Sequence, residues 1–219
     1  MRSILVLNSK GGSGKTTLAT NIAVYYATRG KKVALVDLDA QGSSMDWLAE
    51  RPEHRPPIHG VAGFEGRVRV SGDTDYTIYD APAALHGRSL SEMVRRAQTI
   101  VIPVVPSPID LRAAARFIDE LIGSARVANR QVRVATVANR VREYSPSRWE
   151  LEDFLESLKL SDGRRLPFVA YLRQSQNYAR AAERGLGIWE GTPSLIYYDL
   201  ELWEPLIRWL NSKRSLPDQ

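Results

Sequence analysis

Residues 9–17 read Ser-Lys-Gly-Gly-Ser-Gly-Lys-Thr-Thr, and this glycine-rich stretch decides the fold. A short apolar run, Ser3 to Leu7, comes directly before it, and a helical pattern from Thr16 to Thr28 follows it. Glycine permits the tight turn that points backbone N–H groups inward at an anion, and the start of a helix adds a positive dipole end. The order strand, glycine loop, helix therefore predicts a phosphate-binding loop.

The loop departs from the strict P-loop pattern at one position. Gly14, Lys15 and Thr16 fit the end of that pattern, but Ser9 stands where its first glycine is expected, and Lys10 precedes two glycines. We expect Lys15 to reach the β- and γ-phosphates of ATP and the Thr16 hydroxyl to ligate Mg²⁺. The expected phosphate contacts are Gly11, Gly12, Ser13, Gly14, Lys15, Thr16 and Thr17. An ordinary flexible turn is the alternative, and the flanking strand and helix disfavour it.

Three carboxylates follow predicted strands. Asp37 and Asp39 come at the end of the strand Lys32 to Asp37, and Asp80 follows the strand Tyr76 to Tyr79. The carboxyl ends of parallel strands face the crevice in which ligands bind. Asp80 is therefore expected to hold Mg²⁺ directly or through water. Each aspartate alone could be a simple strand-end cap, but the phosphate loop favours a functional role for all three.

The alternation of strands and helices along the chain predicts one α/β domain over residues 1–219, with a doubly wound, mostly parallel sheet flanked by helices. Further strands are expected at Val68 to Val70, Thr99 to Val105, Val132 to Val137 and 166–171. Further helices are expected at Leu90 to Ala97, from a cap at Asp110 to Gly123, at Ser147 to Leu158 with Ser145 or Ser147 as cap, at Gln176 to Arg184 and at Leu200 to Asn211. Residues 50–66 are expected to form a surface loop.

The composition narrows the class of protein. The chain has 219 residues, and 43% of them are hydrophobic, which fits a globular protein. Its net charge of +5 fits either a protein with an acidic partner such as nucleic acid or simply a basic protein. It contains no cysteine, which excludes disulfides, thiolate metal sites and cysteine nucleophiles. The three histidines lie in loop-like sequence without metal-ligand spacing. No apolar run is long enough for a transmembrane helix and no signal-peptide pattern is present, so we expect a cytoplasmic protein.

Five stretches together resemble the ParA/MinD family of deviant-Walker ATPases, and the resemblance covers almost the whole chain. The stretches are Lys10 to Thr17, Asp37-Leu-Asp39-Ala-Gln41-Gly42, Tyr79-Asp80-Ala-Pro82, Ile102-Pro103 and Asn139-Arg140. The paired-lysine loop followed by the Asp-x-Asp-x-Gln segment is the specific part of this signal.

The resemblance implies a homodimer in which two subunits enclose two ATP molecules. Lys10 matches the signature lysine that reaches the partner's nucleotide, and Asp39 matches the aspartate that positions the attacking water, so Lys10, Lys15 and Asp39 form the expected catalytic set. Asp37 and Asp80 match the acids around Mg²⁺, and Asn139 matches a position that contacts adenine. We expect slow hydrolysis of ATP to ADP and phosphate, stimulated by a partner protein.

The absence of cysteine excludes the iron–sulfur members of the family and disfavours the targeting ATPases that use a zinc-binding cysteine pair. The chain starts directly with its first strand, so we expect no N-terminal helix-turn-helix. Tyr171 to Tyr178 and Gly185 to Glu190 resemble the small ParA proteins.

The small ParA proteins imply ATP-dependent, non-specific binding to the DNA of the nucleoid. By analogy the DNA contacts are Arg173, Arg180, Arg184, Arg208, Lys213 and Arg214, although each could be an ordinary solvated charge. The expected partner is a ParB-like or cargo-adaptor protein, and the cargo is a plasmid, a chromosome region or a protein assembly.

Two alternatives remain open. In a MinD-like membrane switch, the apolar stretch Leu200 to Leu210 would be a lipid-binding amphipathic helix. Its acidic residues Glu201 and Glu204 disfavour anionic lipid, so we favour a helix packed on the domain core and expect no membrane association. A small-molecule ligase or kinase on the same fold is the other alternative, and no further substrate motif supports it.

Overall fold

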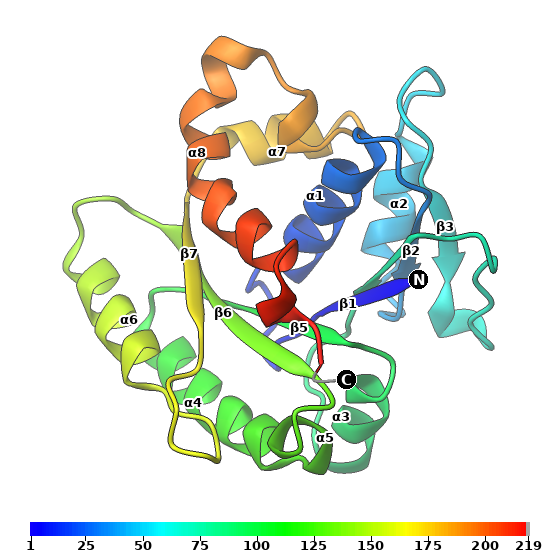
Figure 1. Cartoon of the computed structure of the whole chain (residues 1–219). Coiled ribbons are helices and arrows are strands. Elements are labelled where there is room, and N and C mark those ends of the chain that lie inside the picture. Colours follow the sequence, from blue (N-terminus) through cyan, green and yellow to red (C-terminus); the bar gives the residue numbers. More distant parts are fainter. Residues whose placement is uncertain (218–219) are drawn as a thin grey trace.

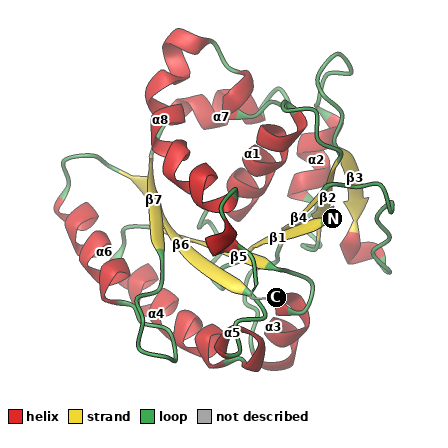
Figure 2. Cartoon of the chain, viewed as in Figure 1, coloured by secondary structure: helices red, strands yellow, loops and turns green. Residues whose placement is uncertain are grey.

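Seven parallel strands form one sheet within residues 1–217, the part of the chain that the computed structural model describes. The strands are β1 (Arg2–Val6), β2 (Val33–Asp37), β3 (His59–Ala62), β4 (Tyr76–Asp80), β5 (Thr99–Val104), β6 (Arg133–Val141) and β7 (Phe168–Arg173). Their order across the sheet is β3-β2-β4-β1-β5-β6-β7 (Figures 1 and 2). The prediction of a single doubly wound sheet is confirmed, and the strand pairs of this sheet are parallel throughout.

Helices cover both faces of the sheet (Figure 2). They are α1 (Lys15–Ala27), α2 (Ser43–Ala49), α3 (Gly87–Val94), α4 (Pro108–Gly123), α5 (Ala125–Ala128), α6 (Pro146–Ser157), α7 (Gln176–Ala182) and α8 (Pro193–Leu210). Short 3₁₀ turns are η1 (Gly63–Glu65), η2 (Ile188–Glu190) and η3 (Lys213–Ser215). Helices α1, α2 and α8 contribute to one hydrophobic cluster, while α3, α4, α5 and α6 contribute to the other.

The two clusters follow from the alternation of side chains along each strand. In β1, Ile4 and Val6 point into the α1 side, whereas Leu5 and the following Leu7 point into the α4 side. A strand buried on both faces must be apolar at every position, which explains the continuous run Ile4 to Leu7. This central strand carries the phosphate loop, so the loop starts from the most buried part of the sheet.

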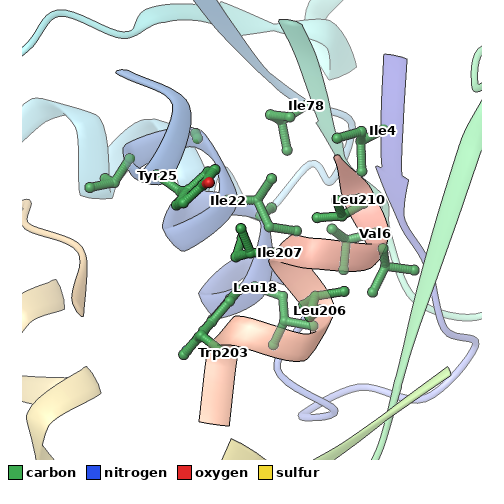
Figure 3. Close-up of a cluster of buried hydrophobic side chains, with 14 of the residues drawn as sticks. Ile4, Val6, Leu18, Ile22, Tyr25, Ile78, Trp203, Leu206, Ile207 and Leu210 are labelled. Atoms are coloured by element: carbon green, nitrogen blue, oxygen red, sulfur yellow. The ribbon is translucent and has the colours of Figure 1, made fainter. Parts of the chain in front are cut away.

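Helix α8 packs over α1 and the sheet (Figure 3). Its apolar residues Trp203, Leu206 and Ile207 lie beside Leu18 and Ile22 of α1 in this close-up, and all five are buried. Burying such side chains contributes roughly 1.5–3 kcal/mol each. The prediction that Leu200 to Leu210 packs on the core is therefore confirmed, and this stretch is not available as a lipid-binding face. Among the described residues, no helix has the length and apolar character needed to span a membrane.

The chain changes direction around β1, which places the site. From β1 it moves out to β2 and β3 on one side, returns to β4, and then builds β5, β6 and β7 on the other side. Val6, Asp37 and Asp80 are in register, so the loops after β1, β2 and β4 leave the sheet at the same level. Such a reversal leaves a crevice at the carboxyl ends of the central strands.

Several predicted boundaries are wrong, each for a physical reason. The predicted loop 50–66 contains β3, because its main chain pairs with β2 although the sequence His59-Gly60 has no strand pattern. The predicted strand Val68 to Val70 is irregular, because this segment joins no strand of the described sheet.

Helix limits differ as well. Helix α3 begins three residues before the predicted Leu90, and α8 begins at Pro193 rather than near Leu200. Proline suits the first helical turn, where its missing N–H costs nothing. For the same reason α4 starts at Pro108 after Ser107, so Asp110 lies inside the first turn and is not the cap.

Candidate phosphate-binding and metal site

The phosphate loop joins β1 to α1 and has the backbone of an anion-binding turn. Gly12 and Gly14 adopt φ angles of 77° and 89°, in the left-handed region that favours glycine. The Lys10 carbonyl accepts hydrogen bonds from Ser13 Oγ (3.1 Å) and Lys15 Nζ (3.2 Å), which closes the loop on itself. These hydrogen bonds and the left-handed glycines hold the loop in the tight turn that an anion-binding loop needs.

Lys15 is buried at the start of α1, with 7% of its surface exposed. Burial lowers the pKa of its ammonium, and the carboxylates of Asp80 and Asp39 oppose this shift by stabilising the charge. An ammonium with so little water around it gains more from a phosphate than an exposed lysine does. The burial of Lys15 beside the glycine loop is compatible with a phosphate-binding role, which stays a prediction.

Asp80 ends β4 directly beside the phosphate loop and is 1% exposed. Its Oδ2 accepts a hydrogen bond from Ser44 Oγ (2.7 Å), while its Oδ1 is buried and has no hydrogen-bond partner within residues 1–217. Burial raises the pKa of Asp80 to about 6, although hydrogen bonds from the hydroxyls of Thr16 and Ser44 lower it in part. A buried carboxylate oxygen without a partner, next to a threonine hydroxyl, suits a hard cation such as Mg²⁺.

Asp37 shapes the segment between β2 and α2. Its Oδ1 accepts from the Asp39 amide (3.0 Å), and its Oδ2 accepts from the amides of Ser44 (2.8 Å) and Met45 (3.3 Å) in the first turn of α2. Burial raises the pKa of Asp37, and these amides oppose the shift. Because both oxygens already accept backbone hydrogen bonds, the geometry favours a helix-anchoring role over direct ligation of Mg²⁺, and the predicted metal role stays a prediction.

Asp39 is half-buried at the edge of the site. Its Oδ1 accepts from the Gln41 amide (3.0 Å), and its charge contributes to the pKa of both Lys15 and Asp37. The predicted catalytic aspartate therefore lies near Lys15, on a loop that Asp37 holds in place.

Lys10 lies on the open side of the loop, where 45% of its side chain is exposed. Its ammonium is 3.4 Å from Asp110 Oδ1 in the first turn of α4, and its amide donates to Asn8 Oδ1 (3.0 Å). The two lysines of the loop thus differ in surroundings: Lys15 points into its own subunit, and Lys10 lies at the surface.

A pocket of about 540 Å³ adjoins the phosphate loop on the β6 side. Its lining includes Thr17, Asn139, Gln174 and Tyr178, so it lies between the start of α1, the end of β6 and α7. Asn139 is buried, and its amide donates to the Ser13 carbonyl (2.8 Å). The predicted adenine contact of Asn139 stays a prediction, but the structure gives this side chain a contact with the phosphate loop.

The six residues predicted to contact DNA do not form one surface. The guanidinium of Arg173 donates to both oxygens of the fully buried Asp199 (2.7 and 3.2 Å). Its charge is therefore paired within the chain, which disfavours a DNA contact, and that contact stays a prediction. Arg208 pairs with Glu204 one turn earlier in α8 (2.6 Å).

The remaining four cations lie at opposite ends of the strands, one pair near the carboxyl ends and one pair near the amino ends. Arg180 and Arg184 are exposed on and just after α7, which follows the carboxyl end of β7. Lys213 and Arg214 are exposed in η3, which contacts the amino ends of strands through the hydrogen bond from Thr99 Oγ1 to the Ser215 carbonyl (2.6 Å). A single DNA-binding face including all four is therefore unsupported.

Two residues that contact the site are not predicted as site residues from the sequence. Ser44 holds Asp80, and Asp110 pairs with Lys10. Neither residue belongs to a motif, because each reaches the site through the packing of a neighbouring helix. The position of Ser44 at the start of α2, two residues after the Asp37 to Gly42 segment, is the one sequence signal that could have suggested it.

A glycine turn with a buried lysine, followed by acids at the ends of neighbouring parallel strands, defines a P-loop nucleotide-binding protein. Residues 4–188 match the family described as the CobQ/CobB/MinD/ParA nucleotide-binding domain, and the chain belongs to this family.

Two curated relatives match most of the chain. It is 28% identical over 194 residues to the maintenance of carboxysome distribution protein A of Halothiobacillus neapolitanus, covering 86% of this chain and 87% of the relative. It is 31% identical over 203 residues to the protein of the same description from Gloeobacter kilaueensis, covering 87% and 86%. A plasmid partition protein of Borrelia burgdorferi, crystallised with AMPPNP, has the same fold with a TM-score of 0.71 at 14% identity, covering 94% of this chain and 98% of that one.

Proposed function

We propose that this chain is a ParA-like ATPase that dimerises with ATP, binds DNA non-specifically and uses partner-stimulated hydrolysis to position a cargo. The observation that carries the proposal is the phosphate loop, with Lys15 buried at its base, Asp39 and Asp80 close to it, and Lys10 exposed beside it. The two relatives named for carboxysome distribution support a positioning role. The MinD-like alternative is less favoured, because the apolar side of α8 is buried.

The residues at the site fit the chemistry of phosphoryl transfer, which depends on positioning and charge neutralisation. Lys15 would bind the β- and γ-phosphates, and Asp39 would orient the attacking water. Thr16 and Asp80 would hold Mg²⁺, as the buried and unpartnered Asp80 Oδ1 suggests. When bound, Mg²⁺ would neutralise negative charge on the phosphates.

Dimerisation would depend on Lys10. Its exposed position beside the loop suits a lysine that reaches the nucleotide of a second subunit, and to do so it must leave Asp110. Hydrolysis would then separate the subunits, which makes the nucleotide state a switch for DNA binding. The expected location is the cytoplasm, with nucleoid association in the ATP state.

One set of measurements tests this proposal. Light scattering after size exclusion gives the mass of the protein with ATP, with ADP and without nucleotide, and each sample is then incubated with non-specific DNA and with anionic liposomes. We expect a dimer that is retained on DNA with ATP alone. Retention on liposomes would contradict the DNA-based proposal, and retention on neither would favour a metabolic enzyme of the same family.

Lys10→Ala separates dimerisation from nucleotide binding. We expect this variant to bind ATP as a monomer and to lose the rise in specific ATPase activity with protein concentration, while the exposed control Lys31→Ala keeps it. A Lys10→Ala protein whose ATPase retained that concentration dependence would remove Lys10 from the proposed mechanism.

The DNA surface can be assigned by two double charge reversals, because the candidate cations lie at opposite ends of the strands. Arg180→Glu with Arg184→Glu tests the surface at α7, and Lys213→Glu with Arg214→Glu tests the surface at η3. Reversal of the pair that contacts phosphate should lower the affinity for DNA. It should also reduce the salt dependence of that affinity, because binding with fewer phosphate contacts releases fewer counterions. A ParB-like or cargo-adaptor protein would then recognise the DNA-bound dimer, with a plasmid, a chromosome region or a protein assembly as cargo.

A further inference from the structure

The carboxyl end of β6 departs from regular strand geometry next to the phosphate loop. The pairing of β6 with β7 shifts register between Ala138 and Val141. Within this irregular segment Arg140 has a φ of 54°, in the left-handed region that a residue with a side chain rarely adopts. Strain of this kind persists where surrounding interactions hold it, and it concentrates at functional sites.

The irregular segment brings two side chains to successive carbonyls of the phosphate loop. Asn139 Nδ2 donates to the Ser13 carbonyl (2.8 Å), and Arg140 Nη1 donates to the Gly12 carbonyl (3.2 Å). The packing is close, since a Cβ built on Gly14 would overlap the Asn139 amide. The end of β6 and the loop therefore fit each other in detail.

These two carbonyls matter because of how an anion-binding turn is built. A loop that points successive amides at an anion must turn its carbonyls the other way, where other side chains or water can donate to them. Lys15 and Ser13 supply donors to the Lys10 carbonyl, while β6 supplies donors to Gly12 and Ser13. The donor to Gly12 is an exposed arginine whose backbone is strained.

We propose that Arg140 is a positioning residue for the phosphate loop. Its guanidinium holds the Gly12 carbonyl away from the anion, together with Asn139 at Ser13, and so keeps the loop amides directed at the triphosphate. The left-handed backbone of Arg140 accompanies this placement of its side chain. The inference rests on the proposed function, because it concerns binding of a nucleotide in this loop.

Arg140→Gly tests the inference, because glycine adopts the left-handed backbone without strain but lacks the guanidinium. We expect an unchanged or higher melting temperature and an affinity for Mg·ATP about tenfold lower, the effect of one hydrogen bond that involves a charge. Arg140→Lys should recover part of the affinity. The matched control is Arg130→Gly, because Arg130 has the same left-handed backbone (φ 56°) and its guanidinium pairs with Asp162 (2.9 Å), not with the phosphate loop.

A comparison of two ligands shows whether Arg140 acts on the phosphate loop or on the base of the nucleotide. Titration calorimetry with Mg·ATP and with magnesium tripolyphosphate, which has no base, should show the same fold loss for Arg140→Gly. A loss with ATP alone would mean that Arg140 acts on the nucleoside, and unchanged affinity for both ligands would mean that it does not position the loop; either result overturns the inference. If the wild-type protein bound neither ligand, the proposed function itself would fail.

Discussion

Helices α1 and α7 both border the proposed nucleotide site, but they are held in opposite ways. Every residue of α1 from Leu18 to Ala27 is buried, between the sheet on one side and α8 on the other. No residue of α7 is fully buried, and two pockets of about 540 and 290 Å³ adjoin it. The proposed phosphate end of the site therefore lies on a densely packed helix, whereas α7, on the proposed nucleoside side, is loosely packed.

This contrast has a consequence for binding. Preorganised groups contribute more affinity because little ordering remains to be done when the ligand arrives. We therefore expect substitutions at the α1 end to have large effects on ATP affinity and substitutions on α7 to have small ones. The predictions below test this order, starting from the largest effect.

Lys15→Ala should abolish nucleotide binding, with an affinity for Mg·ATP lower by at least about 100-fold, because the main charged donor to the phosphates is lost. Equilibrium binding of fluorescent ATP measures the effect, and Lys31→Ala, at an exposed position, serves as the control. A Lys15→Ala protein that bound ATP within about threefold of wild type would contradict a phosphate site at the start of α1.

Asp39→Ala should keep ATP binding but lose hydrolysis, so that the dimer persists. The reason is that Asp39 lies at the edge of the site, where its Oδ1 accepts a hydrogen bond from the Gln41 amide and not from the loop glycines. Single-turnover hydrolysis and light scattering after ATP addition measure the two properties. Normal turnover in this variant would remove Asp39 from the catalytic set.

Asp80→Asn should stabilise the nucleotide-free protein at neutral pH. The pKa of Asp80 is about 6 in the fold and near 4 in the unfolded chain, so the folded state holds its proton more tightly. The stability of the wild-type protein should therefore fall as pH rises from about 4 to about 6, by at most about 3 kcal/mol, and the cost is fully present above the folded pKa.

Denaturant unfolding of wild type and Asp80→Asn at pH 4.5 and pH 7.5, two chosen conditions, measures this difference. The gain of the variant should be larger at the higher pH. A gain that did not change with pH would show that ionisation of Asp80 carries no such cost, and would weaken the case for a site that receives a cation.

Tyr178→Phe should have the smallest effect. It removes the hydrogen bond between Trp203 Nε1 and the Tyr178 hydroxyl (3.0 Å), which costs about 1 kcal/mol of stability, but the loose α7 wall should transmit little of this to ATP affinity. Thermal unfolding and ATP titration measure both quantities. A loss of ATP affinity as large as that of Lys15→Ala would reverse the comparison between α1 and α7.

How much the sequence predicts also differs between the two halves of the site. The glycine loop, Lys15 and the three aspartates could be located because their chemistry is written in short motifs on consecutive elements. Asn139 and Arg140 could be linked to the site by family resemblance, but their hydrogen bonds to Ser13 and Gly12 depend on the irregular end of β6. No local pattern signals a left-handed arginine in a strand.

Predictions based on charge alone were the weakest. Arg173 is an arginine at a strand end, and the sequence does not show that Asp199, on another element, is buried beneath it. Similarly, the apolar stretch of α8 predicts a buried face without deciding between protein core and lipid. Packing against Leu18 and Ile22 of α1 shows that this face belongs to the protein core. The sequence does not reveal this packing, because the two helices are far apart along the chain.

The central claim is that a nucleoside triphosphate binds in the loop after β1 and that pairing of two subunits depends on it. Isothermal titration of the purified protein with Mg·ATP, followed by light scattering of the same sample, tests the claim most directly. The account predicts saturable binding of one ATP per subunit together with a doubling of mass that Lys15→Ala abolishes. Absence of binding at millimolar Mg·ATP, or ATP binding with an unchanged monomer mass, would contradict it.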